Sequence, residues 1–265
     1  MYYYNQNDYS SVPYPYNDNG KTVKTSGCGV CCACIVYNSL AGKELYSVKK
    51  MAEFSLKNNG RDSSGTDMTN LLTALFNKNK DFKFKTTNDE NEVVKHLRSG
   101  GMAIANQGDE YNVFSTNGHF VVLSKMNGNN IEVLDPQMYD GKYDAYSRPK
   151  RIVKKTATGC IVSKTELSKA TQDRSPAYFL ITYTKPKEVK PMPKYPYFTP
   201  NATVKAKTKV YADSNRKTEV GSVSKNERVK ALFIGPTNAC IQYKVTDTVY
   251  KVGLIYSKNV KKDKK

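Results

Sequence analysis

Cys28 and His119 have the residue types and surroundings that nucleophilic catalysis requires. Cys28 lies in the segment Ser-Gly-Cys-Gly at 26–29, directly before a long run of small and apolar residues. A thiol at the N-terminus of a helix faces unpaired amide groups and the positive end of the helix dipole, which favour the thiolate. The alternative is a small buried residue, which we expect for the three cysteines within 31–34.

His119 is one of only two histidines in the chain and begins a strand-like segment, His-Phe-Val-Val-Leu-Ser, after a glycine. A strand would fix its backbone while its ring points into a cleft, which suits a general base. The other histidine, His96, lies in a charged helical segment, and we expect it to be a surface or boundary residue.

Asp135 ends the next strand-like segment along the chain. If Asn-Gly-Asn-Asn at 127–130 closes a hairpin, His119 and Asp135 lie near its open end on adjacent strands. A carboxylate there can accept the imidazole N–H and fix its tautomer. Asp-Pro is also a favoured turn sequence, so a turn is the alternative. The order Cys, His, Asp along the chain matches papain-type chemistry.

The six cysteines do not indicate a disulfide framework or a metal centre. Cys160 and Cys240 are far from the other four, and a chain of this length without an export signal is not of the disulfide-stapled class. The Cys-x-x-Cys pair at 28–31 lacks the second ligand pair that a zinc site needs. We therefore expect neither a metal nor a cofactor.

The elements that would position these residues are helices first and strands afterwards. Helical patterns cover 28–41, start again at Ser47 and at Thr66, and recur over 91–98. Strand patterns cover 102–105, 119–124, 130–134 and 177–183, whereas the composition of 1–26 predicts an irregular lead-in. This order predicts an α+β domain over residues 1–184.

A proline-rich segment at 185–200 predicts a semi-rigid linker, and the short strand patterns over 201–265 predict a small all-β barrel. Residues 185–265 hold 19 Lys and Arg against 6 Asp and Glu, while residues 1–184 hold 23 against 18. Such a basic module attracts polyanions. For the lysine run at 261–265 alone, a solvated tail is the alternative.

The chain shows no export or membrane-spanning signal. No apolar run approaches the roughly 20 residues of a membrane helix, and the N-terminus lacks a basic start followed by an apolar stretch. We expect synthesis in the cytoplasm without a signal peptide. Nucleic-acid binding would account for the charge but not for Cys28, His119 and Asp135 in this order.

Motifs over residues 3–183 resemble the double-glycine-peptidase-like group of papain-fold cysteine peptidases. They are Gly-Cys-Gly at 27–29, Gly-Thr at 65–66, Gly-His at 118–119 and Leu-Asp-Pro at 134–136. The resemblance implies a papain-like fold and places Gln6 in the oxyanion hole. One departure is Val-Cys at 30–31, where the group usually has Pro-Thr or Pro-Ser, so the entry into the helix can differ.

Residues 209–232 resemble a bacterial SH3-type domain, a class that often binds cell-wall polymers. The usual Gly-Trp dipeptide is absent and the chain has no Trp. We expect three tyrosines to supply the aromatic surface instead: Tyr243, Tyr250 and Tyr256.

The combination resembles a phage or bacterial peptidoglycan hydrolase. It implies an SH3-like barrel and an endopeptidase or amidase that uses Cys28, His119, Asp135 and Gln6. The expected partners are peptidoglycan and anionic wall polymers. As in phage lytic enzymes, the wall would be reached after holin-type release or as a virion component. The alternatives are a bacteriocin leader-type protease and a catalytically inactive wall- or polyanion-binding protein.

Overall fold

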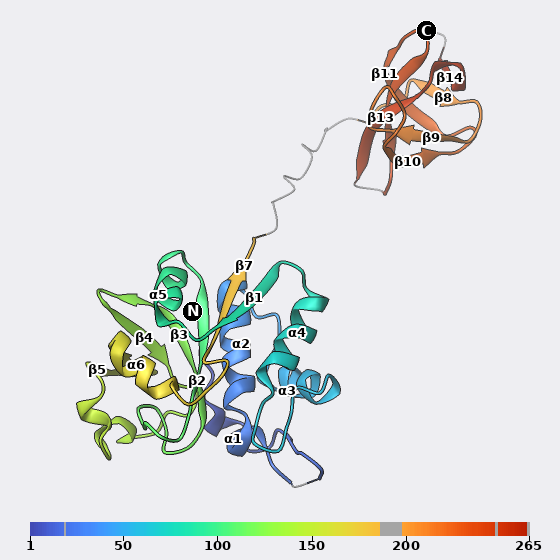
Figure 1. Cartoon of the computed structure of the whole chain (residues 1–265). Helices are drawn as coiled ribbons and strands as arrows, with labels where there is room; N and C mark the ends of the chain where they lie inside the picture. Colours follow the sequence, from blue (N-terminus) through green and yellow to red (C-terminus); the bar gives the residue numbers. More distant parts are fainter. Residues whose placement is uncertain (19, 186–197, 247–248, 264–265) are drawn as a thin grey trace. The chain divides into compact units, whose positions relative to one another are not determined.

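The computed structural model describes residues 1–18, 20–185, 198–246 and 249–263. The chain divides into two compact units, Met1–Lys187 (unit 1) and Glu188–Lys265 (unit 2), which Figure 1 shows in sequence colours. Most of the predicted linker at 185–200 lies outside the described residues. No helix among the described residues is both long and apolar enough to span a membrane.

Unit 1 is built on a seven-stranded sheet in the order β1-β7-β2-β3-β4-β6-β5, with every pairing antiparallel. Its strands are β1 (Phe82–Thr87), β2 (Met102–Gln107), β3 (His119–Asn127), β4 (Asn130–Leu134), β5 (Lys154–Thr156), β6 (Gly159–Val162) and β7 (Tyr178–Tyr183). Its α-helices are α1 (Val23–Ser26), α2 (Cys28–Ala41), α3 (Val48–Lys57), α4 (Met68–Lys78), α5 (Glu90–Arg98) and α6 (Lys164–Thr171). Three short 3₁₀ helices complete it: η1 (Gln6–Asp8), η2 (Lys142–Asp144) and η3 (Arg148–Lys150).

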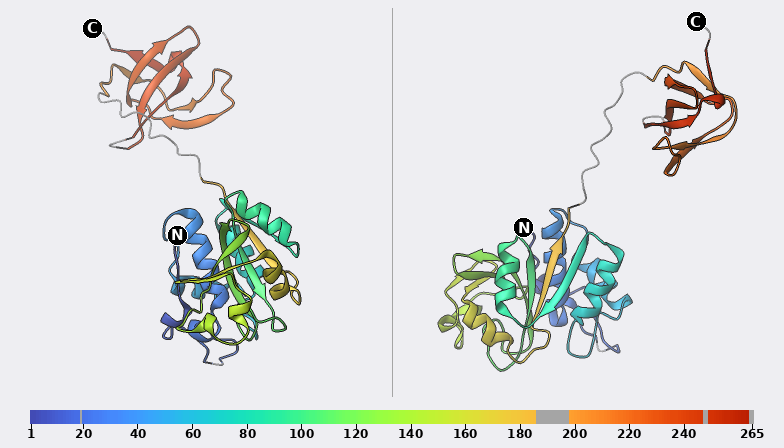
Figure 2. Two further views of the ribbon diagram at one scale, coloured as in Figure 1. Left: turned by 90° about the vertical axis from the view of Figure 1, so that its left-hand side faces the viewer. Right: turned by 45° about the horizontal axis from the view of Figure 1, so that its top comes forward.

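Alternate residues of the central strands face two separate cores, because successive strand side chains point to opposite faces. Ile104 and Val122 pack with α2, α3 and α4. Ala105 and Val121 pack with α5 and α6. The sheet therefore lies between two layers of helices, as the views in Figures 1 and 2 show. The predicted mixture of helices and antiparallel strands is confirmed.

The helices begin and end where capping residues stand. Gly27 is the N-cap of α2, and Gly42 ends that helix with a φ of 70°, a left-handed conformation that glycine adopts without strain. The Ser47 side chain accepts a hydrogen bond from the backbone of Lys50 and caps α3. The next helix begins at Met68, later than the sequence predicts from Thr66.

The N-terminal segment is irregular over most of its length, as its composition predicts, but it is packed into unit 1. It forms η1 and α1, and its Tyr14 side chain is fully buried. The Tyr14 hydroxyl makes hydrogen bonds with Ser55 Oγ at 2.8 Å and Thr66 Oγ1 at 3.1 Å. Burial of an aromatic ring and satisfaction of its hydroxyl together fix this segment against α3 and the start of α4.

Unit 2 is all-β among its described residues and has its own hydrophobic core. Its elements are β8 (Ala202–Val204), β9 (Thr208–Tyr211), β10 (Glu219–Val223), β11 (Arg228–Ile234), β12 (Asn238–Lys244), β13 (Tyr250–Tyr256), the 3₁₀ helix η4 (Ser257–Asn259) and β14 (Val260–Lys262). The strand order is β10-β9-β13-β12-β11-β8-β14. Within the described residues no pairing joins β10 to β14, so no closed barrel is found, and the predicted SH3-like barrel is not shown.

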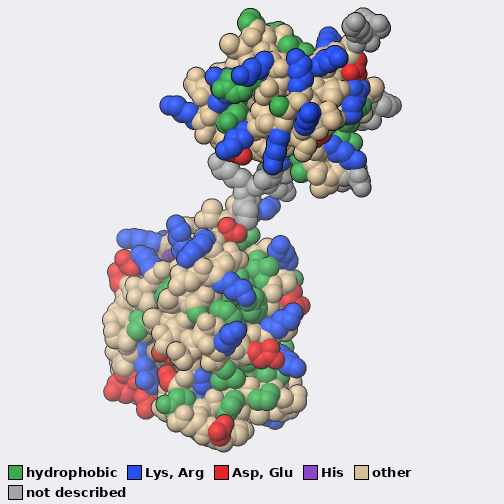
Figure 3. Space-filling view, turned by 90° about the vertical axis from the view of Figure 1, so that its right-hand side faces the viewer, with side chains coloured by type: hydrophobic (Ala, Val, Ile, Leu, Met, Phe, Trp, Pro, Cys, Tyr) green, Lys and Arg blue, Asp and Glu red, His purple; other side chains and the backbone are tan. Residues whose placement is uncertain are grey.

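Tyr243, one of the three tyrosines expected on the surface of unit 2, is buried. The side of unit 2 that Figure 3 presents instead carries many Lys and Arg side chains and few acidic ones.

Candidate active site

Cys28 is the first residue of α2 and remains partly exposed, unlike the cysteines behind it. Burial raises the pKa of its thiol, but a hydrogen bond and the positive charge from His119 outweigh burial, and the net pKa is lowered. The backbone amides of Phe120 and Gly29 also favour the thiolate. The site thus stabilises the nucleophilic form of Cys28.

His119 opens β3 and is buried beside Cys28. Its Nε2 lies 2.8 Å from Asp135 Oδ1 and donates to it. This leaves Nδ1 as the ring nitrogen that faces the thiol. Burial lowers the pKa of the imidazole, but the charge of Asp135 outweighs burial, and the net pKa is raised. An imidazolium paired with a thiolate is therefore favoured.

Asp135 follows β4 directly, so the β3–β4 hairpin brings it beside His119 as the sequence predicts. The carboxylate is fully buried. It accepts hydrogen bonds from Gln137 N at 2.9 Å and from the Tyr143 hydroxyl at 2.7 Å. Burial raises its pKa, but the charges of His119 and Lys142 outweigh burial and hold the pKa well below its ordinary value.

Lys142 is a functional candidate that sequence reasoning missed. Its side chain is only 1% exposed, and its Nζ lies 2.5 Å from Asp135 Oδ2. The same ammonium donates to Gln137 O at 3.0 Å. A lysine in a polar loop between Tyr and Gly residues carries no local signal of burial, because only the fold brings the 137–150 segment against Asp135.

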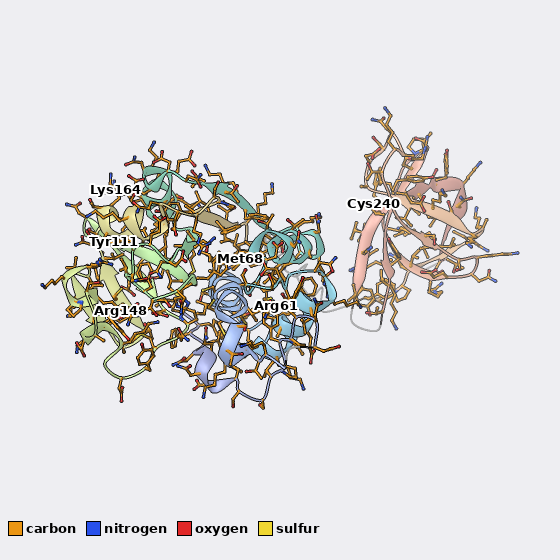
Figure 4. The ribbon with its side chains drawn as sticks, turned by 60° about the horizontal axis from the view of Figure 1, so that its bottom comes forward. Arg61, Met68, Tyr111, Arg148, Lys164 and Cys240 are labelled. Atoms are coloured by element: carbon orange, nitrogen blue, oxygen red, sulfur yellow. The ribbon has the colours of Figure 1, made fainter. Side chains whose placement is uncertain are left out.

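Arg148, also buried, supports the same segment by donating from Nη1 to Lys142 O at 2.9 Å. Figure 4 shows Arg148 in the region that follows β4, while Arg61 and Met68 lie beside α2, which is seen there nearly along its axis. Lys142 thus contacts the Asp135 carboxylate directly, and Arg148 contacts the backbone of Lys142.

Gln6 lies in η1, and its side chain is buried. Its Nε2 donates to the backbone oxygen of Lys24, a residue four positions before Cys28, at 2.8 Å. Its backbone N donates to Pro136 O at 2.6 Å. The segment is fixed further by the Tyr3 hydroxyl, which donates to Asp135 O at 2.7 Å. The N-terminal residues therefore connect the turn after β4 to the approach to Cys28.

Gln107, at the end of β2 beside His119, is fully engaged in hydrogen bonds with the loop that follows it. Its Oε1 accepts from the backbone amides of Val113, Phe114 and Ser115, and its Nε2 donates to three carbonyls of the 108–117 loop. It organises the loop before β3, and its amide has no donor to spare.

His96 is buried rather than at the surface. Its Nε2 lies 3.0 Å from Met102 O and 2.9 Å from Ile181 O, so it joins α5 to β2 and β7. Cys31 and Cys32 are buried, and burial raises the pKa of both thiols. Burial likewise raises the pKa of Cys34 and of Cys160 to about 12. These thiols are therefore poor nucleophiles.

Cys28 and His119 line a cleft of about 250 Å³. One set of lining residues comes from the 62–69 segment at the start of α4, and the other comes from the sheet, at Asn106, at 118–120 and in the segment before β7. Gly29 lets α2 approach the 62–69 segment, because a Cβ at this position would lie 2.5 Å from Thr66 Cβ. The Gly-Thr pair at 65–66 is thus packed directly against the start of α2.

No set of three or more His, Cys, Asp or Glu side chains within the described parts of the chain could hold a metal ion. The arrangement itself is a hydrogen-bonded series from Cys28 through His119 to Asp135, opening into a cleft. Such a series can generate a thiolate, and it can return a proton to a leaving group.

No family model and no curated protein matches this chain. Among solved structures, the chain is similar to the peptidase domain of Streptococcus ComA, a bi-functional ABC transporter involved in a quorum-sensing pathway. The identity is 14% and the TM-score is 0.39, and the match covers 61% of this chain and 93% of that chain. A protein described as a C39-like peptidase from Bacillus anthracis matches with 13% identity and a TM-score of 0.41. The match covers 67% of this chain and 97% of that chain. Ly7917 with the hydrolysing product of MDP matches with 15% identity, coverage of 76% and 68%, and a TM-score of 0.23. At these identities and TM-scores the similarities do not indicate a function for this chain.

Proposed function

We propose that this chain is a cysteine-dependent hydrolase of peptide-type bonds and that its substrate is bacterial peptidoglycan. The observation that carries the enzymatic part is the series Cys28, His119 and Asp135. Cys28 is a partly exposed residue at a helix N-terminus, the pKa of its thiol is lowered, and the pKa of the neighbouring imidazole is raised. A merely structural cysteine has no need of any of these features.

The proposed reaction proceeds through a thioester. The Cys28 thiolate attacks the amide carbonyl, and the oxyanion is held by the backbone N–H of Cys28 and by the Gln6 side chain. The His119 imidazolium then protonates the leaving amine. Water, deprotonated by His119, cleaves the thioester and restores the thiol.

Gln6 suits the oxyanion role because its amide is held beside the segment that leads to Cys28. Lys24 O accepts only one of the two N–H groups of the Gln6 amide. The second N–H is the one that we assign to the oxyanion.

The wall substrate is proposed from unit 2 and from the family resemblance of both units. We assign residues 1–184 to a papain-like catalytic domain, 185–200 to a linker and 201–265 to an SH3-like wall-binding domain. The excess of 13 positive charges over 185–265 supports binding of anionic wall polymers. We further propose a phage lytic type of enzyme that reaches the wall after holin-type release or within the virion.

The deciding experiment compares wild-type protein with Cys28→Ala and His119→Ala on purified peptidoglycan, with mass spectrometry of the released fragments. Both variants should lose activity by about 10³-fold or more. Cys240→Ala is the matched control, because that partly exposed thiol lies in unit 2 and should be dispensable. Fragments that identify a new amine and carboxyl end would establish the bond, whereas full activity in Cys28→Ala would refute the proposal.

A further inference from the structure

The cleft beside the nucleophile is electrically polarised. Arg174, three residues beyond the end of α6, is the only Lys or Arg among the described residues that line it. Asp62 and Asp67 line the part formed by the start of α4. A substrate that enters this cleft therefore meets a cation on one side and two carboxylates on the other.

The Arg174 guanidinium has hydrogen-bonding capacity that the fold leaves largely unused. Its Nη2 lies 3.6 Å from Asp109 Oδ1, and the two side chains are 36% and 70% exposed. An exposed pair at that distance is weak. Its Nε is buried without a hydrogen-bond partner in the described chain. Because a guanidinium offers five donors in a planar fork, this side chain is suited to a carboxylate.

The Arg174 guanidinium lies next to Gly118, the residue that precedes the catalytic base His119. A Cβ on Gly118 would lie 3.0 Å from Arg174 Nη2, so the absence of a side chain at 118 leaves room for the guanidinium. Gly118 immediately precedes His119. An anion held by Arg174 would therefore lie close to the reacting groups.

The two carboxylates are already committed to local structure. Asp62 Oδ1 accepts from the backbone of Ser64 at 2.8 Å, and Asp67 Oδ1 accepts from Asn70 N at 2.9 Å and caps α4. They make their side of the cleft unfavourable for a second anion. The charge pattern therefore favours one orientation of an anionic substrate.

We propose that Arg174 binds a carboxylate of the substrate, so that the enzyme prefers peptide segments with a free carboxylate near the scissile bond. This proposal deepens the proposed peptidoglycan hydrolase activity and rests on it for the identity of the substrate. The anion preference of the cleft itself can be measured without any hydrolysis.

The first test compares alkylation of Cys28 in the full chain by iodoacetate, an anion, and by iodoacetamide, its neutral analogue. The ratio of the two rates cancels any change in thiolate population. Arg174→Gln should lower this ratio by about three-fold or more, as loss of one charge contact does. Arg98→Gln makes the same chemical change at an exposed position on α5, away from the cleft, and should leave the ratio unchanged.

Asp67→Asn should move the ratio in the opposite direction, since it removes a negative charge while asparagine still caps α4. Arg174→Lys keeps the positive charge, so its ratio should lie between those of the wild type and of Arg174→Gln. This variant preserves the test if Arg174→Gln fails to fold. An unchanged ratio in Arg174→Gln, with folding verified by circular dichroism, would overturn the proposal.

The second test uses peptidoglycan whose stem-peptide carboxylates are free or amidated. Arg174→Gln should raise KM on the free-carboxylate substrate and have little effect on the amidated one. Equal losses on both would overturn the role of Arg174 while leaving the hydrolase proposal standing. If wild-type protein cleaves neither, the proposed function fails, and the haloacetate ratio still decides whether Arg174 binds anions.

Discussion

At the scale of single residues, the pKa shifts predict the pH range over which Cys28 is reactive. The pKa of the thiol is lowered and that of His119 is raised, and both shifts favour the thiolate–imidazolium pair. Alkylation by iodoacetamide should therefore begin at a lower pH than for an ordinary thiol. Hydrolysis, which also needs the imidazolium, should fall as pH rises through the pKa of His119.

The measurement is the rate of Cys28 alkylation against pH in wild-type protein and His119→Ala. The variant should follow the simple titration of a thiol at higher pH. Coincident profiles would show that His119 does not form the ion pair. For stability, the raised pKa of His119 contributes below its unfolded value of about 6.5 and is lost as pH rises through the folded pKa.

Lys142 is predicted to set the upper end of that pH range. Its positive charge lowers the pKa of His119, so Lys142→Met should raise this pKa and shift the alkaline limb of activity to higher pH. The titratable groups around this ammonium include Asp135, Tyr143, Cys160, His119 and Tyr139, and the Asp135 carboxylate is paired with it directly.

Lys142→Met should also destabilise the protein by about 3–5 kcal/mol, because it leaves a buried carboxylate with one cation fewer. Lys155→Met is the matched control: Lys155 pairs with Asp144, but both side chains are more than half exposed. That pair should contribute at most about 1 kcal/mol. Chemical denaturation of both variants measures this, and equal destabilisation would contradict the assigned role of Lys142.

At the scale of elements, the close approach of α2 to the 65–66 segment fixes the cleft. Gly29→Ala would place a methyl group 2.5 Å from Thr66 Cβ and should destabilise unit 1 by about 1–3 kcal/mol, as overpacking does. Gly65→Ala is the control in the same region, because the nearest atom to its Cβ would be 4.0 Å away. Thermal unfolding of the two variants tests the difference, and a Gly29→Ala protein as stable as Gly65→Ala would refute this packing.

Element prediction from the sequence succeeded where local signals were strong, but it missed β1 and α6, although both have a signal in the sequence. For β1, the signal is the alternation Phe-Lys-Phe-Lys, which is typical of a strand. Ser163, whose side chain accepts from Glu166 N, forms the Ser-x-x-Glu start of α6. The 127–130 hairpin was predicted and is present, with Asn127 paired to Asn130.

At the scale of the whole molecule, the basic charge of unit 2 predicts salt-sensitive binding to cell walls. The full chain should sediment with purified Gram-positive walls more than a chain that ends at Lys187. The difference should shrink as salt rises, since exposed charges are screened within about 8 Å at physiological ionic strength. Walls stripped of teichoic acid distinguish anionic polymers from peptidoglycan as the ligand. Equal sedimentation of the two chains at low salt would refute wall targeting by unit 2.

The sequence by itself determined the identity of the nucleophile and base candidates and the hairpin that joins His119 to Asp135. Those depend on local patterns: a helix start, a buried strand and a two-residue turn. Residues 1–26 are mostly irregular, as expected, but local patterns do not predict the burial of Tyr14 or the contacts of Gln6, which are made with residues distant in sequence. The small barrel expected for 201–265 is all-β as predicted, but no closure is found among its described residues, since strand lengths do not specify which edges pair.

Only the tertiary structure decided what surrounds the reacting groups. A lysine in a polar loop is ordinarily solvated, and nothing near Lys142 in sequence indicates that it lies beneath Asp135 with 1% of its side chain exposed. Likewise, Arg174 reaches the cleft only because β7 returns beside β2, next to the strand that begins at His119. The free energy of a buried charge depends on partners that the fold brings together, and short-range sequence patterns do not encode those partners.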